Sequence, residues 1–155
     1  MAVYYHDTSA LVKHYHEEIG TAVVDQIISI PNNSHYLSRL AGIELRSASA
    51  KNVRMDLITV VDFHNLHGKF QADIRNGQFQ ILHLLSRHLQ KAENLIIQHA
   101  TTNSLRTLDA IQLAVALDFH QRHRLDFFVC ADANLCMVAI AEGLAVINPV
   151  THTPE

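Results

Sequence analysis

Four acidic residues lie among apolar neighbours, and their chemistry suits the binding of a hard metal ion. They are Asp7, Glu44, Asp109 and Asp132. Carboxylates are rarely fully buried unless they are paired or coordinate a metal, because desolvating an isolated charge is costly. Oxygen ligands of this kind favour Mg²⁺ or Mn²⁺, whereas a zinc site would require histidine or cysteine ligands. The pattern therefore predicts one metal site that contains all four side chains.

Each carboxylate taken alone also has a purely structural interpretation. Asp7 is in a position to cap the helix that we expect from about Ala10, and Asp109 is in a position to offset the dipole of its own helix. Glu44 is harder to explain in this way, because we expect it in the middle of a helix and among apolar neighbours. Single residues leave both interpretations open, so the metal interpretation depends on all four coming together.

The elements that must position these residues alternate between strands and helices along the chain. We predict strands over residues 3–6, 35–38, 79–82, 127–131 and 145–147. We predict helices from about residue 10 and over residues 21–30, 39–52, 57–75, 86–98, 107–119 and 133–142. This alternation predicts a three-layer α/β/α fold with a mostly parallel central sheet. Asp7 and Asp132 come directly after strands, where the sheets of such folds usually bind their ligands.

The length of 155 residues predicts one domain over residues 1–150, followed by a short C-terminal tail at 151–155. No apolar run approaches the ~20 residues that a membrane-spanning helix needs. The N-terminus has no basic region of the kind that begins a signal peptide. We therefore expect a cytoplasmic protein without a membrane segment.

The net charge of −3 is unusual for a protein that binds nucleic acid, since such domains are usually basic. Carboxylates that bind a cation explain part of this charge. A local basic stretch contains Arg39, Arg46, Lys51 and Arg54, opposed only by Glu44. This stretch is either a track for RNA or a solvated helix face, and its composition does not distinguish the two.

The cysteines and histidines match no zinc or redox motif. We expect Cys130 and Cys136 to be free, largely inert thiols and not a disulfide. Most of the twelve histidines are expected on the polar sides of helices. His6 is adjacent to Asp7, but side chains alternate along a strand, so we expect it to point away from Asp7 and assign it no role.

Four segments resemble, in the same order, the motifs of the PIN-domain ribonucleases, and in particular those of the VapC-like toxins. The segments are YYHDTSALVKHYHEEIG, LSRLAGIELRSASAK, LRTLDAIQLAVAL and FVCADANLCMVAIAEGLAVINP, which extend from Tyr4 to Pro149. Each segment contains one of the four acidic residues at the acidic position of its motif. Cys130 departs from the family pattern, which has Ser or Thr there, and a thiol is a weaker hydrogen-bond partner for the support of Asp132. The polar helix predicted over 57–75 is also longer than in compact members of the family.

The resemblance implies an endoribonuclease that depends on Mg²⁺, with Mn²⁺ as the alternative metal. Its catalytic residues and metal ligands are Asp7, Glu44, Asp109 and Asp132. It implies hydrolysis of phosphodiester bonds in a structured RNA by a water that the metal activates. The expected context is a type II toxin–antitoxin pair, in which the toxin forms a homodimer and a small antitoxin covers the acidic pocket. No further cofactor is expected.

Supporting or substrate-binding roles are expected of a few residues near the motifs. Thr8 and Ser9 either cap the first helix or assist the site, and Arg46 and Lys13 either contact RNA phosphates or are ordinary surface charges. Two alternatives to the toxin remain. One is a housekeeping PIN-domain nuclease that processes RNA, and the other is a non-catalytic interaction module on the same fold.

Overall fold

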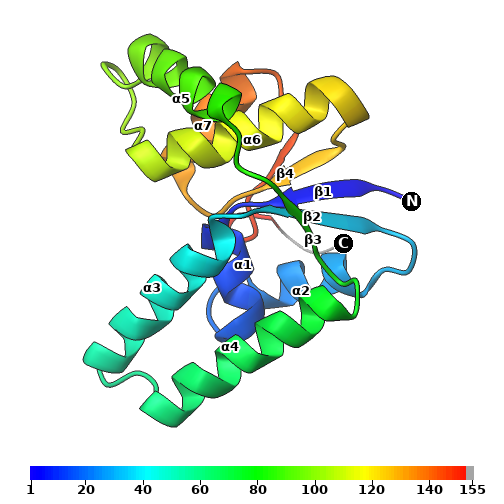
Figure 1. The fold of residues 1–155 in the computed structure, drawn as a ribbon, viewed down its shortest axis with the longest axis vertical. Helices are drawn as coiled ribbons and strands as arrows, with labels where there is room; N and C mark the ends of the chain where they lie inside the picture. The colour runs from blue at the N-terminus through cyan, green and yellow to red at the C-terminus, as the bar shows by residue number, and fades with distance from the viewer. Residues whose placement is uncertain (153–155) are drawn as a thin grey trace.

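The fold is described for residues 1–152 by a computed structural model, in which one sheet lies between two layers of helices (Figure 1). The strands are β1 (Val3–His6), β2 (Ser34–Ser38), β3 (Gln80–Leu82), β4 (Phe127–Val129) and β5 (Val146–Ile147). Their order in the sheet is β3-β2-β1-β4-β5, and every neighbouring pair is parallel. The predicted three-layer α/β/α fold is confirmed, with a sheet that is parallel throughout.

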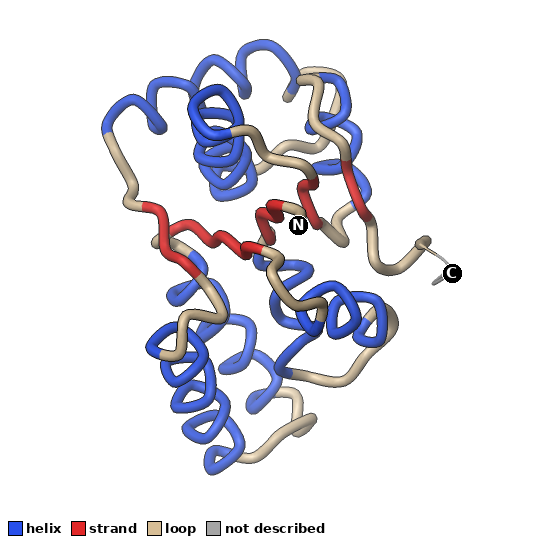
Figure 2. The backbone as a smooth tube through the Cα atoms, turned by 90° about the vertical axis from the view of Figure 1, so that its right-hand side faces the viewer, coloured by secondary structure: helices blue, strands red, loops and turns tan. Residues whose placement is uncertain are grey.

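The helices divide between the two faces of the sheet, as the view along the sheet shows (Figure 2). One layer contains α1 (Thr8–Tyr15), α2 (Thr21–Ser29), α3 (Ala41–Arg54) and α4 (Val60–Arg75). The other layer contains α5 (Ser86–His99), α6 (Thr107–His123) and α7 (Ala133–Ala141). None of the helices within residues 1–152 is long and apolar enough to cross a membrane.

The central strands are buried on both faces, so their side chains alternate between two cores. Tyr5 and Phe128 stack against each other and pack with Leu113 in the core beneath α5, α6 and α7. Tyr4 and Val129 point to the opposite face and pack against α1 and α2. This two-sided packing holds the ends of β1 and β4 in place, and the loops that follow these strands carry Asp7 and Asp132.

Two helices begin later than the sequence pattern suggests. Helix α3 begins at Ala41, so Glu44 lies in its first turn and not in mid-helix. Helix α4 begins at Val60 because Thr59 and Asp62 form a capping box: the Thr59 hydroxyl accepts a bond from the Asp62 N–H, and the Asp62 carboxylate accepts one from the Thr59 N–H.

Three histidines lie in the core and not on the polar sides of helices, where most of the histidines were expected. His6, His35 and His88 are buried, and the rings of His6 and His35 hydrogen-bond to each other at 3.0 Å. His6 packs away from Asp7, on the α1–α2 side of the sheet, as the alternation of the strand predicts. The expected tail at 151–155 falls partly outside the described residues, which end at His152.

Candidate active site

Four helices begin around one pocket, and each brings one of the predicted carboxylates to it. Asp7 caps α1 directly after β1, and Asp132 caps α7 beyond β4. Glu44 and Asp109 lie in the first turns of α3 and α6. All four line one open pocket of about 440 Å³. Because a helix N-terminus carries partial positive charge, four such ends favour negative charge here.

Asp7 is the most deeply buried of the four, with 4% of its surface exposed. Its Oδ2 accepts hydrogen bonds from the backbone N–H of Ser9 at 3.0 Å and from the Ser9 hydroxyl at 2.5 Å. Burial raises the pKa of Asp7 to about 6, and the nearby charge of Asp109 adds to the rise, while the bonds from Ser9 oppose it. The ionised form of Asp7 is therefore costly until a cation stabilises it.

The Cys130 thiol lies behind Asp7. Its Sγ is 3.9 Å from Asp7 Oδ2 and 3.7 Å from the Ser9 hydroxyl. Its contact with Asp132 is to the backbone oxygen and not to the carboxylate. The Asp132 carboxylate instead accepts a bond from the N–H of Leu135, at the start of α7. The departure from the family pattern at Cys130 therefore affects the surroundings of Asp7 more than the carboxylate of Asp132. Both cysteines are buried and free, as expected.

Glu44 is held by Gln112, a polar residue on the buried side of α6. The Gln112 amide donates to Glu44 Oε1 at 2.8 Å and to the Thr8 hydroxyl at 3.2 Å. Its carbonyl oxygen accepts a bond from the Tyr5 hydroxyl. Gln112 is fully buried, so these three bonds fix the orientation of its amide and, through it, the position of Glu44. Burial raises the pKa of Glu44, and the bond from Gln112 opposes the rise.

Asp109 and Asp132 share one basic partner. Arg106 Nε lies 3.3 Å from Asp109 Oδ2, and the Arg106 Nη2 lies 3.6 Å from Asp132 Oδ2. The Arg106 side chain is 76% exposed, so it reaches the carboxylates from the mouth of the pocket. Burial raises the pKa of Asp109 even though the charge of Arg106 acts to lower it.

The donor set of the pocket fits a hard divalent cation, because four carboxylates offer oxygen ligands. Within residues 1–152, however, no three His, Cys, Asp or Glu side chains are arranged to hold one ion in this conformation. Binding an ion through three carboxylates therefore requires the side chains to move toward one another. Lys51, Arg54 and Arg106 also line the pocket, so three basic groups face the four acidic ones.

The sequence model of the PIN domain family matches residues 4–141, most of the chain. The chain belongs to the PIN domain family. This match includes all four carboxylates of the pocket, which thus lie on a PIN domain at the carboxyl ends of its strands. No curated protein matches the chain by sequence.

Solved structures share the fold over nearly their whole length. VapC20 of Mycobacterium tuberculosis, described as a toxin that cleaves the sarcin–ricin loop, is 15% identical with a TM-score of 0.66, and the match covers 94% of this chain and 99% of that one. FitAcB from Neisseria gonorrhoeae is 19% identical with a TM-score of 0.66, and the match covers 96% of this chain and 99% of that one. VapBC2 from Rickettsia felis, bound to a DNA fragment from its promoter, is 13% identical with a TM-score of 0.62. The match covers 94% of this chain and 98% of that one. At these identities the likeness shows that the PIN fold is shared.

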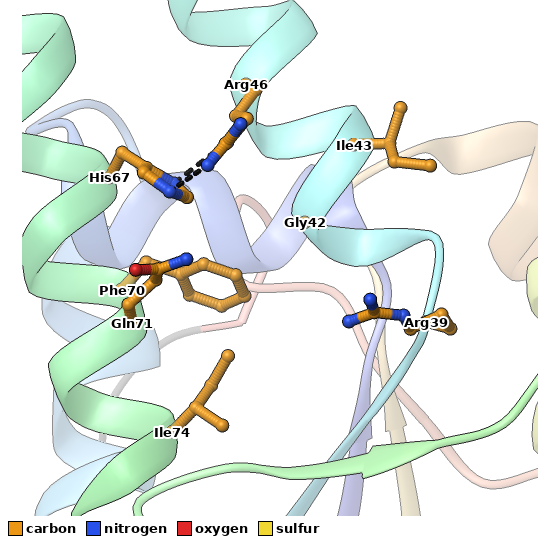
Figure 3. A pocket seen from close by; sticks show the side chains of 8 residues that line it. All are labelled: Arg39, Gly42, Ile43, Arg46, His67, Phe70, Gln71 and Ile74. Carbon is orange, nitrogen blue, oxygen red and sulfur yellow. Dashed lines mark hydrogen bonds between the residues drawn. The ribbon is translucent and has the colours of Figure 1, made fainter.

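The residues predicted to assist the site lie in different places in the structure. Thr8 and Ser9 line the pocket, and Ser9 also accepts a bond from the Ala131 N–H, which ties the end of β1 to the end of β4. Arg46 does not line the pocket. It lies in a groove between α3 and α4, where its guanidinium bonds to the ring of His67 (Figure 3). Lys13 is buried and paired with Glu18 at 3.0 Å, so it is not available to RNA.

The four basic residues of the predicted stretch also line two different hollows of the structure. Lys51 and Arg54 line the carboxylate pocket, whereas Arg39 and Arg46 line the groove beside α4 (Figure 3). Arg39 precedes α3, and Lys51 follows Arg46 by five residues, which places these two side chains on different sides of the helix. Of this stretch, Lys51 and Arg54 are the residues that line the carboxylate pocket.

Two residues of the PIN site, Gln112 and Arg106, were not predicted from the sequence. Gln112 could have been noticed, because it is the one amide within the apolar run AIQLAVAL of α6. Arg106 stands three residues before Asp109, a spacing at which side chains on a helix meet. Its contact with Asp132, however, joins residues that are 26 positions apart, and no local pattern reveals such a contact.

Proposed function

We propose that this PIN domain, over residues 1–150, is a Mg²⁺-dependent endoribonuclease and the toxin of a type II toxin–antitoxin pair. The observation that carries the proposal is the convergence of four carboxylates from four helix N-termini on one pocket with a basic rim. An acidic centre suits a divalent cation, and a basic rim suits a phosphodiester backbone. A purely structural role for each acid does not explain why all four share one pocket.

Asp7, Glu44, Asp109 and Asp132 would hold Mg²⁺ or Mn²⁺ in this pocket. When bound, the cation would supply a Lewis acid that activates water and stabilises the charge on the leaving oxygen. The residues around it have separate tasks. Ser9 orients Asp7, and Gln112 orients Glu44, so that both carboxylates keep a defined direction toward the pocket.

The RNA backbone would contact the basic rim. Lys51 and Arg54 lie on the last turn of α3, and they line the same pocket as Glu44. Their charges would neutralise phosphates on either side of the bond that is cleaved, and contacts of this kind position the RNA without reading its sequence. The local rim thus supports RNA binding in a chain whose net charge is −3.

An antitoxin and a second copy of the chain are the proposed protein partners. Two of the solved structures with this fold are described as a VapBC complex on promoter DNA and as a toxin–antitoxin complex from Klebsiella pneumoniae. The described surface also keeps exposed apolar side chains that a protein partner would cover. They include Met55, Leu57, Val60 and Val61 at the turn between α3 and α4, and Leu89, Ile97 and Leu108 on α5 and α6.

The decisive experiment is an RNA-cleavage assay with Mg²⁺ or Mn²⁺ that compares the wild type with Asp7→Asn. We expect cleavage by the wild type, loss of cleavage in EDTA, and a rate at least about a hundredfold lower for the variant, since it removes a ligand and a charge. Asp25→Asn is the matched control, because Asp25 lies on the exposed side of α2 and its carboxylate bonds only to His14 among the described residues.

The outcomes separate this proposal from its alternatives. Wild-type protein that cleaves no RNA with either metal would indicate a non-catalytic interaction module. Cleavage that persists in EDTA or in Asp7→Asn would contradict the role given to the carboxylates. Metal-dependent cleavage without growth arrest on overexpression would favour the housekeeping nuclease over the toxin.

A further inference from the structure

Arg106 is the only basic side chain, among residues 1–152, that forms an ion pair with the pocket carboxylates. It precedes the first residue of α6, and its guanidinium spans from Asp109, on the same helix, to Asp132 at the start of α7. Arg106 is therefore the counterion of Asp109 and Asp132.

The contacts of Arg106 are suited to exchange. Its distances to the two carboxylates are 3.3 and 3.6 Å, longer than a strong charged hydrogen bond, and its side chain is 76% exposed. An exposed ion pair of this kind contributes little to stability. A divalent cation carries twice the charge and would bind through the same two carboxylates, so cation and guanidinium would compete for Asp109 and Asp132.

We propose that Arg106 is an exchangeable counterion, which holds Asp109 and Asp132 before the divalent cation binds and is then released to contact an RNA phosphate at the mouth of the pocket. This inference rests on the proposed function, and it gives that site a positioning residue that couples loading of the cation to binding of the RNA. Released from the carboxylates, the guanidinium keeps its charge and its planar set of N–H donors, which match a phosphate.

The basic residues around the pocket show where a released Arg106 would meet the RNA. Lys51 and Arg54 already line the α3 side of the pocket, and Arg106 enters from the α6 side. A phosphodiester bound over the carboxylates would then have basic groups on both sides. With Arg106 still paired to Asp109 and Asp132, only the α3 side would present a basic group free of the carboxylates.

The test measures Mn²⁺ binding by electron paramagnetic resonance, independently of activity, for wild type, Arg106→Gln and Arg106→Lys. Removing the competing charge should tighten Mn²⁺ binding about three- to tenfold in Arg106→Gln. The effect should be smaller in Arg106→Lys, which keeps the charge but loses the planar guanidinium. Arg122→Gln is the matched control. Arg122 also forms an exposed ion pair on α6, with Asp118 at 3.0 Å, but at the opposite end of the helix.

Kinetics at saturating Mg²⁺ test the second half of the proposal. Arg106→Gln should raise the KM for RNA about three- to tenfold with a smaller change in kcat, because a phosphate contact contributes to binding in both ground and transition states. The dependence of RNA binding on salt should also become shallower, by about one phosphate contact. Arg122→Gln should alter none of these values.

The outcomes keep this inference distinct from the proposed function. Unchanged or weaker Mn²⁺ binding by Arg106→Gln, with normal binding and cleavage by the wild type, would overturn the exchange and leave the nuclease intact. Tighter Mn²⁺ binding with an unchanged KM would overturn the contact with RNA. A wild type that neither binds Mn²⁺ nor cleaves RNA would overturn both proposals.

Discussion

The burial of Asp7 makes the metal-free protein less stable than it would be without this charge. In the folded protein the pKa of Asp7 is about 6, against an ordinary value of 3.8, and burial is the main cause. Between these values the folded protein binds more protons than the unfolded chain, so stability falls as the pH rises through this window. Replacing Asp7 with Asn removes the titration, and we expect Asp7→Asn to be more stable than the wild type at neutral pH in EDTA.

The magnitude follows from the two pKa values. The difference between about 6 and 3.8 corresponds to about 3 kcal/mol at neutral pH, at 1.36 kcal/mol per pH unit. Asn keeps only part of the hydrogen bonding with Ser9, which offsets some of this gain. We therefore expect a net stabilisation of about 1–2 kcal/mol, equivalent to a rise in Tm of about 2–8 °C for a chain of this size.

Urea unfolding in EDTA, followed by circular dichroism between about pH 4.5 and pH 7.5, measures this effect. Other groups also titrate in this range, so the informative quantity is the difference in unfolding free energy between Asp7→Asn and the wild type. This difference should increase by about 2 kcal/mol from the lower to the higher pH. Mg²⁺ should then stabilise the wild type more than the variant, because a bound cation offsets the cost of the Asp7 charge.

A difference that stays constant across this pH range would refute the argument that burial of the Asp7 charge destabilises the fold. So would a wild type that is more stable than Asp7→Asn at every pH in EDTA. Asp25→Asn again serves as the control, since it removes an exposed carboxylate and should show no comparable gain at neutral pH.

Two further predictions concern buried polar groups beside the site. Gln112→Leu should destabilise the protein by about 1–3 kcal/mol in chemical denaturation, because it leaves the fully buried Tyr5 hydroxyl without its Gln112 partner. His35→Phe should make the protein less sensitive to acid, because burial lowers the pKa of His35 to about 4. A neutral buried histidine contributes stability that is lost as the pH falls from about 6.5 toward 4, with a slope of up to about 1.4 kcal/mol per pH unit, and unfolding at several pH values measures it.

Their controls use the partners in the structure. Tyr5→Phe combined with Gln112→Leu should cost less than the sum of the two single changes, because the double variant leaves neither group of the pair unmatched. Strict additivity would show that the Tyr5–Gln112 bond contributes nothing. His35→Phe retains a ring that can stack on Tyr4, as His35 does at 5.4 Å, and an unchanged acid slope would contradict the buried-histidine argument.

The sequence was a good guide to elements and to the four acids. Hydrophobic periodicity located the strands and helices, because these depend on residues only a few positions apart. Their boundaries were less secure: α3 starts two residues later than expected, which moves Glu44 to the first turn, and the Thr59–Asp62 capping box delays α4.

The acidic residues were recognisable because each stands among apolar neighbours, and a buried charge is costly without a function. By itself the sequence thus determined the α/β alternation, the four candidate carboxylates and their resemblance to the motifs of one family. These features are local, and they are encoded by residue type and short-range spacing.

Only the tertiary structure decided which side chains meet. The strand order places the ends of β1 and β4 side by side, and the helices that follow bring together carboxylates up to 125 residues apart. It also joins Arg106 to Asp132 and Gln112 to Glu44, and it turns Arg46 away to His67. Such contacts depend on how distant segments cross over the sheet, and the depth of burial that raises the pKa of Asp7 depends on the same packing.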